Sequence, residues 1–548
     1  MDSNNPAAST TAAQPAQPDV NTALGKVAGK TASSQSKLAT LLKVHRKLAI
    51  VLLLPVIAWC LSGLTHPLVA HFFTTEAART AQPLTPLPAF SEANALSPQR
   101  AVSISGFETI DNIQIVSLGD RFFYQLGQRF QTPAATQAIS EWREAAPWPF
   151  WQFSYVPLDY HPANNTKIAV NASNVDNNRL SDMHHHQYAE SLARFYAGDD
   201  DSPIASITTL SEYDAFYTSI NRRLPVERVI FDRGDGLTVY IDPLTGELAA
   251  VSDQKRDVLL WIFRNLHTWD FLAERHHPVR VAVLQTLIAL TLIMGISGLV
   301  LYTVMYKKLY RNGKGRGGNA RVHRLMGIVI ALPLIGFATS GLHVVSSKYT
   351  PEHHFAYQPD LGFTTDELTL NPLAATNTMD AYQISLARLN GEPHWQLLTH
   401  SDDGKTIQYL TMQGDVVEGG DTQYATQIAN NVSGLPTDAI KGTQVRHAFG
   451  RDYPQVMKRL PVNRIAYGDN NGTRVFVETR TGLVAGMGTQ ADGLRSLHFM
   501  MLHKYRFLNG LGTTNRDLVM TALVLGIVGV CLLGLSMLVR RKFRRGAV

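Results

Sequence analysis

The sequence contains one apolar segment twice, and each copy is long enough to cross a lipid bilayer. The first copy, residues 44–70, reads VHRKLAIVLLLPVIAWCLSGLTHPLVA, and the second, residues 322–345, reads VHRLMGIVIALPLIGFATSGLHVV. Their Val-His-Arg start, their proline and their Ser-Gly pair recur 278 residues apart. As a helix, the segment from His45 to His66 would span about 31 Å, close to the ~30 Å of a bilayer's hydrocarbon core. The first copy therefore carries a histidine near each membrane face.

Two further apolar runs complete a set of four predicted membrane spans, at residues 44–70, 281–305, 325–345 and 517–540. Lysines and arginines precede the first span, fill the 306–324 loop and follow the fourth span. Such basic flanks stay in the cytoplasm. We therefore predict a multi-pass protein of a bacterial inner membrane with both termini inside. Residues 1–40, rich in Ala, Ser and Thr, are expected to be a disordered cytoplasmic tail, and residues 541–548 a second cytoplasmic tail.

The long segments 71–280 and 346–516 are then periplasmic, and they also resemble each other. The run Arg223-Leu-Pro-Val matches Arg459-Leu-Pro-Val at an offset of 236 residues, and the same offset extends into the second and fourth spans. Alternating apolar runs around Gly-rich turns predict β-hairpins in each copy. The fold expected is a four-helix membrane bundle of two pseudo-symmetric halves, with two periplasmic α+β domains. Residues 131–220 are predicted to be an insertion, with His184, His185 and His186 in a solvated loop.

Composition excludes several functions. The net charge of +6 comes from flanks that topology already explains, so we predict no nucleic-acid partner. The two cysteines, Cys60 and Cys531, lie inside apolar runs, which argues against a disulfide framework or a thiolate metal site. The sequence shows no phosphate-binding glycine loop, no nucleophile elbow, no zinc-protease motif and no dinucleotide fingerprint. If the protein transfers electrons, the absence of a dinucleotide fingerprint means that their donor is a separate cytoplasmic reductant, flavin- or NAD(P)H-linked.

Four histidines follow the repeat, His45 with His323 and His267 with His503. A histidine beside hydrocarbon is costly unless it has a role, and neutral imidazole is a good ligand for metals and for haem iron. We predict two bound haems, each held between one histidine of either half: His45/His323 on the inner side and His267/His503 on the outer side. Nearby glycines would let a flat macrocycle approach the helix backbone. The competing interpretation is that these histidines have only a structural role, which duplication of one half copied into the other.

Four other residues rank second as cofactor-binding residues. His66 and His343 reach the outer ends of the first and third spans but break the repeat register by one position. Arg280 and Arg516 keep the register, 13 residues after His267 and His503. Guanidinium groups match carboxylates, so these arginines are expected either to pair with haem propionates or to anchor helix ends at the interface.

With these residues, the chain resembles the PepSY-associated transmembrane family, whose members include ferric-siderophore reductases of the FoxB type. The resemblance rests on the Val-His-Arg spans, the Ser-Gly pairs, the turn Val-Tyr-Ile-Asp-Pro-Leu-Thr-Gly at 239–246 and the Leu-His pairs before the second and fourth spans. It covers residues 40–545. It implies four transmembrane helices, two periplasmic PepSY-like domains, b-type haems, and electron transfer across the inner membrane to iron held by a siderophore or to another periplasmic acceptor.

Two other classes of function remain open from the sequence. PepSY-like units without haem would bind peptides or inhibit a protease, with the spans as anchors. A transporter is the other alternative, because repeated halves are common among transporters; the scarcity of ionisable residues at mid-depth argues against it. If the protein is a haem-dependent ferric-siderophore reductase, the haems carry out the redox chemistry, and we predict no catalytic side chain.

Overall fold

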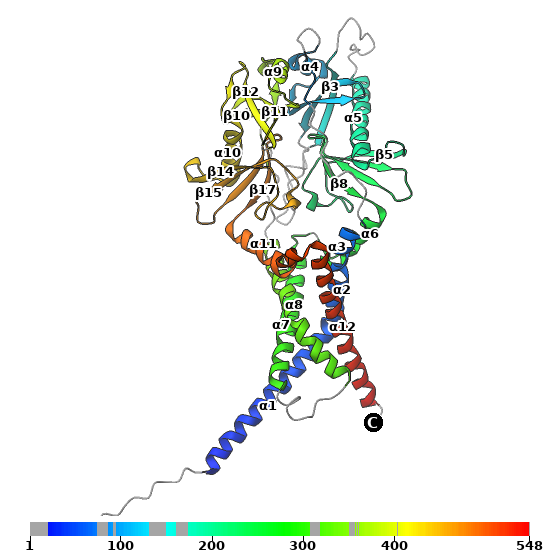
Figure 1. Cartoon of the computed structure of the whole chain (residues 1–548), viewed down its shortest axis with the longest axis vertical. Coiled ribbons are helices and arrows are strands. Elements are labelled where there is room, and N and C mark those ends of the chain that lie inside the picture. Colours follow the sequence, from blue (N-terminus) through cyan, green and yellow to red (C-terminus); the bar gives the residue numbers. More distant parts are fainter. Residues whose placement is uncertain are drawn as a thin grey trace, which may run out of the picture. The chain divides into compact units, whose positions relative to one another are not determined.

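The computed structural model, drawn in Figure 1, divides into two compact units. The first comprises Met1–Ile57, Leu290–Ile335 and Gly526–Val548, and the second comprises Ala58–Ala289 and Gly336–Leu525. The structure describes residues 20–73, 86–90, 95–130, 150–159, 174–273, 275–306, 318–349, 357, 359, 361–402 and 404–546.

Within these residues, four helical segments are long and apolar enough to cross a membrane. They are Leu53–His71, α7 (Pro278–Tyr306), α8 (Asn319–Ser346) and the Thr513–Arg540 part of α12 (Thr513–Gly546). All four coincide with the predicted spans. The chain is a multi-pass membrane protein.

The first span is divided at two prolines. It consists of the end of α1 (Val20–Val51), then α2 (Leu53–Gly63) and α3 (Thr65–His71). Proline has no N–H to donate to the carbonyl four residues earlier. Pro55 therefore leaves Val51 without that bond, and Pro67 does the same to Gly63, which are the last residues of α1 and α2. Neighbouring backbone bonds, such as Leu68 N–H to the Leu64 carbonyl at 3.2 Å, keep the path helical.

The second part of the predicted disordered tail, residues 20–40, is helical in the structure. Helix α1 begins at Val20 and runs without a break into the first span. Helix α1 is rich in Ala, Lys and Leu, which are good helix formers, and a helix already nucleated in the span propagates easily. Residues 1–19 lie outside the described part of the chain.

The first half of the second unit contains two antiparallel sheets. One has the order β2-β3-β4, and the other β5-β6-β7-β8. The predicted turn at 119–120 is confirmed, with Leu118 paired to Arg121. The elements are α4 (Pro98–Ser105), β2 (Asn112–Leu118), β3 (Arg121–Phe130), β4 (Phe150–Pro157), α5 (Asn174–Ala197), β5 (Ile204–Leu210), β6 (Val226–Phe231), β7 (Thr238–Ile241), β8 (Leu248–Ser252) and α6 (Gln254–Ile262).

The second half repeats this element order. Its sheets are β10-β11-β12-β13 and β14-β15-β16-β17, all antiparallel. The elements are α9 (Leu373–Thr378), β10 (Gln383–Leu389), β11 (Glu392–Ser401), β12 (Gly404–Thr411), β13 (Val416–Val417), α10 (Gly420–Ser433), β14 (Ile440–Arg446), β15 (Val462–Tyr467), β16 (Arg474–Glu478), β17 (Leu483–Gly488) and α11 (Gln490–Leu502). The predicted hairpins, β6–β7 and β15–β16, are both present.

The described part of the segment 131–220, which was predicted to be an insertion, contains elements that the second half also has. It supplies β4, α5 and β5, which occupy the same place in the element order as β12, α10 and β14 of the second half. The histidine triplet in this segment also differs from expectation, because it lies on α5 and not in a loop. His185 is buried, with Nδ1 2.8 Å from the Tyr155 hydroxyl and Nε2 2.9 Å from Glu227.

One hydrophobic cluster is shared by the two halves. Side chains of β2 and β3, such as Ile113 and Tyr124, pack in the same cluster as Trp395 and Leu397 of β11. A short strand from each half, β1 (Thr109–Ile110) and β9 (Phe363–Thr364), also pairs across the boundary. Each half also has a hydrophobic cluster of its own, around Tyr196 and Val239 in the first half and around Tyr424 and Val477 in the second.

Buried charges lie at the same boundary. Arg223 pairs with Asp242 at 2.9 Å and donates to the Lys458 carbonyl at 2.7 Å. Its repeat counterpart, Arg459, pairs with Glu478. The Lys458 ammonium donates to the carbonyl of Ala249 at 2.6 Å. Burial, with Arg223 nearby, lowers the pKa of Lys458 to about 7.

Candidate functional site

His267 is held against the first span by its Nδ1 atom. It ends a short π-helical turn, Phe263–His267, that follows α6. Nδ1 lies 3.2 Å from the Trp59 carbonyl and 3.3 Å from the Ser62 hydroxyl oxygen. The ring stacks on Phe263 with 4.7 Å between ring centres. Desolvation lowers the pKa of His267 to about 4, so the imidazole is neutral at physiological pH.

His503 occupies the matching place in the other half. It caps the C-terminus of α11, and its Nδ1 lies 3.1 Å from the Ser340 hydroxyl oxygen on α8. It stacks on Phe499 with 4.7 Å between ring centres, as His267 does on Phe263. Desolvation, followed by the neighbouring His267, lowers the pKa of His503 to about 3.

The structure brings these two imidazoles together. Their ring centres are 6.2 Å apart and their planes are 84° from parallel. Two imidazole nitrogens at about 2 Å on opposite sides of one metal, with ring centres about 1 Å further out, would be separated by about 6 Å. The observed spacing matches that arrangement.

The hydrogen bonds decide which ring nitrogen is free to bind a metal. A backbone carbonyl only accepts, so Nδ1 of His267 carries the proton and donates it to Trp59. Ser340 already donates its own proton to the Gly336 carbonyl at 2.8 Å, so it accepts from His503 Nδ1. In both neutral rings Nε2 is then unprotonated. This is the pattern of a metal-binding histidine oriented by a second hydrogen bond.

The predicted inner pair lies in the first unit and is held in the same way. His45 Nδ1 is 2.9 Å from the Ser297 hydroxyl oxygen on α7. His323 Nδ1 is 3.2 Å from the Val530 carbonyl on α12. The two imidazoles interact electrostatically. The Val530 carbonyl again fixes the proton on Nδ1 of His323 and leaves its Nε2 as the available ligand atom.

Glycines stand beside three of these four rings. A Cβ atom at Gly298 would lie 3.2 Å from His45 Cε1, and one at Gly534 would lie 3.6 Å from His323 Cε1. Gly63 has the same relation to His267, also at 3.6 Å. The absence of these side chains lets each ring lie against a neighbouring helix.

The prediction from sequence gave a role to the glycines of the Ser-Gly pairs but none to their serines. A Ser-Gly dipeptide occurs at 62–63, 297–298 and 340–341, and each serine contacts a repeated histidine. At the fourth position the serine is replaced by Leu533, and His323 bonds the Val530 carbonyl in its place. Recurrence of Ser-Gly in three spans was the signal that could have identified these hydroxyl groups.

The second-ranked residues have other partners. His343 is exposed, and its Nδ1 lies 3.2 Å from Nδ1 of His498 on α11, a residue outside the repeat. His66 interacts electrostatically with Lys504 and Asp517. In the part of the chain that the structure describes, no group of three or more His, Cys, Asp or Glu side chains is arranged to hold a metal ion.

Arg280 and Arg516 are engaged by nearby protein groups. Arg280 is buried, donates to the carbonyls of Thr268 and Ala273 at 2.9 and 3.0 Å, and pairs with Asp270. Arg516 pairs with Asp517 and donates to Asn509 at 2.9 Å. Each arginine thus lies near the start of a spanning helix, α7 or α12, in contact with nearby protein groups.

The fold and these sites define a multi-pass membrane protein with α+β domains and paired histidines beside the spans. The family model described as the PepSY-associated TM region matches residues 157–541. The chain belongs to this family. A comparison with curated proteins finds no match.

Proposed function

We propose that this protein is an inner-membrane haem-b protein that moves electrons from a cytoplasmic reductant to a periplasmic acceptor, ferric iron held by a siderophore. The observation that carries the proposal is the histidine geometry. At three of the four positions serine hydroxyls hold Nδ1, at the fourth a carbonyl does, and His267 and His503 face each other at 6.2 Å. The spacing of His267 and His503 fits bis-histidine ligation, and the repeat extends this assignment to His45 and His323.

Haem bound at each pair would supply one-electron redox chemistry that no side chain of the chain offers. His45 and His323 would hold the iron on one side of the membrane, and His267 and His503 on the other. Ser62, Ser297 and Ser340 would orient the rings.

The direction of transfer follows from charge. Basic residues at both termini and in the 306–324 loop favour a cytoplasmic location for these segments. The sheets of the second unit then lie in the periplasm, where an imported ferric chelate arrives. The reductant is a separate cytoplasmic donor, flavin- or NAD(P)H-linked.

Histidine variants test the ligand assignment. Haem per protein is measured by pyridine haemochrome in wild type, His45→Ala, His323→Ala, His267→Ala and His503→Ala, with His400→Ala, an exposed histidine on β11, as control. Each substitution within a pair should remove the same single haem, and the control should retain both. A colourless wild-type protein from haem-replete cells would reject the proposal and favour a haem-free PepSY binding protein. Separate, additive losses from His45 and His323 would reject ligation shared between the halves.

Oriented vesicles test the direction. A membrane-impermeant ferric chelate added outside should oxidise the reduced protein, and His267→Ala should abolish this while the inner haem remains reducible. Unchanged oxidation in that variant would show that electrons leave elsewhere, with His66 and His343 the first residues to examine.

A further inference from the structure

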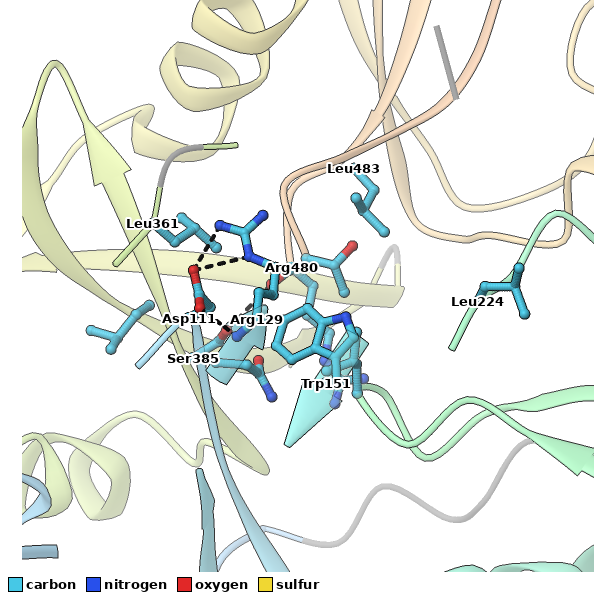
Figure 2. A pocket seen from close by; sticks show the side chains of 12 residues that line it. Asp111, Arg129, Trp151, Leu224, Leu361, Ser385, Arg480 and Leu483 are labelled. Carbon is cyan, nitrogen blue, oxygen red and sulfur yellow. Dashed lines mark hydrogen bonds and ion pairs between the residues drawn. The ribbon is translucent and has the colours of Figure 1, made fainter. Parts of the chain in front are cut away.

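The space between the two halves of the second unit is too small for a ligand (Figure 2). Its cavity volume is about 20 Å³, which holds about one water molecule. Asp111 and Arg129 form an ion pair there at 2.7 Å, and Arg480 faces the Glu247 carboxylate. The charges that line this space are therefore already balanced by the protein.

A pair of imidazoles on the surface of the second unit has no such explanation. His343, near the end of α8, has its Nδ1 atom 3.2 Å from Nδ1 of His498 on α11. The ring centres are 5.4 Å apart, and the ring planes are 55° from parallel. His343 is exposed and His498 is half-buried, so solvent and small ions reach the pair.

The spacing of the pair fits two ligands of one metal ion. Imidazole nitrogens bind zinc at ~2.0–2.1 Å, so two of them at a tetrahedral angle lie about 3.3–3.4 Å apart, with ring centres about 5 Å apart. The observed 3.2 and 5.4 Å are close to both values. Without a metal, the two nitrogens share one proton, because a neutral imidazole can donate and accept.

The charges near the pair do not exclude a cation. Arg495, one helix turn before His498 on α11, interacts electrostatically with His343. Arg495 also pairs with the carboxylate of Asp492 at 2.8 Å. This ion pair reduces the repulsion that a bound cation would meet.

The internal repeat shows that both histidines belong to one half alone. Thr65 stands at the position that matches His343, at an offset of 278 residues, and Ile262 at the position that matches His498, at an offset of 236. Duplication of a structural histidine therefore explains neither residue. The two departures from the repeat occur at side chains that contact each other.

We propose that His343 and His498 bind one divalent first-row transition-metal ion through their Nδ1 atoms. Imidazole is a suitable ligand for zinc, copper, nickel and ferrous iron, and each Nδ1 has a free lone pair when the ring proton is on Nε2. Two protein ligands leave the other coordination positions to water or to a chelator.

Ferrous iron is the ion expected at this pair, an assignment that rests on the proposed function. Ser340, which holds His503, lies three residues before His343 on α8, about 4.5 Å along the helix. One electron from the reduced outer haem converts chelated Fe³⁺ into Fe²⁺ and leaves the haem oxidised. Fe²⁺ is softer than Fe³⁺, so it is held less strongly by the chelator's oxygens and more readily by imidazole.

Isothermal titration of the full-length protein with Zn²⁺ tests the site independently of any redox activity. The variants are His343→Thr and His498→Ile, which introduce the residues of the first half, and His400→Ala on β11 is the control. Each of the two variants should weaken binding of one Zn²⁺ per chain at least 10-fold, and the control should not change it. Wild-type affinity in both variants, or no saturation up to about 1 mM, would overturn the proposal.

Anaerobic equilibrium dialysis against ferrous sulfate tests the identity of the ion. Wild-type protein should bind one more Fe²⁺ per chain than the double variant His343→Thr/His498→Ile, and more weakly than Zn²⁺. Saturation with Zn²⁺ should remove the same single Fe²⁺. Equal Fe²⁺ binding by wild type and the double variant would reject ferrous iron as the ion. A colourless protein that binds Zn²⁺ at this pair would reject the proposed function and leave the metal site standing.

Discussion

Placing an alanine at Gly298 tests whether the space beside His45 is required for ligation. The added Cβ would lie 3.2 Å from His45 Cε1, closer than an ordinary van der Waals contact, so the ring must move by a few tenths of an ångström. At Gly534 the same substitution meets His323 Cε1 at 3.6 Å, which is an ordinary contact. The two positions correspond in the repeat, so they form a matched pair.

The expected loss of haem affinity is that caused by displacing a metal ligand. Disturbing the groups that orient a ligand typically lowers metal affinity by about 10- to 100-fold, which corresponds to about 1.4–2.7 kcal/mol. Gly298→Ala should lower haem affinity at the His45/His323 pair by about 10-fold, whereas Gly534→Ala should change it by less than about 2-fold. Since alanine favours a helix over glycine by about 1 kcal/mol, unfolding is not the expected cause.

The assay is titration of haem into haem-depleted protein, followed by pyridine haemochrome quantification. Gly298→Val should give a larger loss than Gly298→Ala. The control is Gly327→Val on α8, because a Cβ at Gly327 meets no atom within 4 Å. Full haem content in Gly298→Val, or an equal loss in Gly327→Val, would refute the reasoning.

Three further predictions concern other groups. Ser340→Ala removes the hydroxyl that accepts from His503; we expect about a 10-fold loss of haem affinity at the outer pair, and unchanged affinity would show that the serine does not orient the ring. Since the pKa of Lys458 is lowered to about 7 and an unfolded lysine titrates near pH ~10.4, folding releases a proton between these values and stability rises with pH there, by at most about 1.4 kcal/mol per unit. Thermal unfolding of wild type should show this rise from pH 7 to 9 and Lys458→Met should flatten it; equal slopes would contradict the linkage. His185→Ala leaves Glu227 and Tyr155 without this partner and should destabilise the protein by about 1.5–3 kcal/mol in denaturant unfolding; a change below about 0.5 kcal/mol would oppose this.

The sequence predicted the spans and hairpins because their signals are local. Apolar length, β-rich runs and turn residues act over short windows, and α7, α8, β6–β7 and β15–β16 all lie where expected. Pro55 and Pro67 also act locally, because α1 and α2 end four residues before them.

Other features depend on distant contacts and could not be found in this way. The burial of His185 requires Tyr155 and Glu227, which are brought to it only by the sheets. The elements β4, α5 and β5 have the same order as β12, α10 and β14, but the prediction from sequence did not relate them. The role of the serines beside the histidines depends on packing between spans, which no single segment encodes.

The haem content of the purified wild-type protein tests the central claim most directly. Protein from haem-replete cells is quantified by amino-acid analysis and its haem by pyridine haemochrome, with reduced and oxidised absorption spectra recorded on the same sample. The four oriented histidines predict a red protein with two b-type haems per chain and the spectra of six-coordinate iron. A colourless protein without a Soret band would contradict the account.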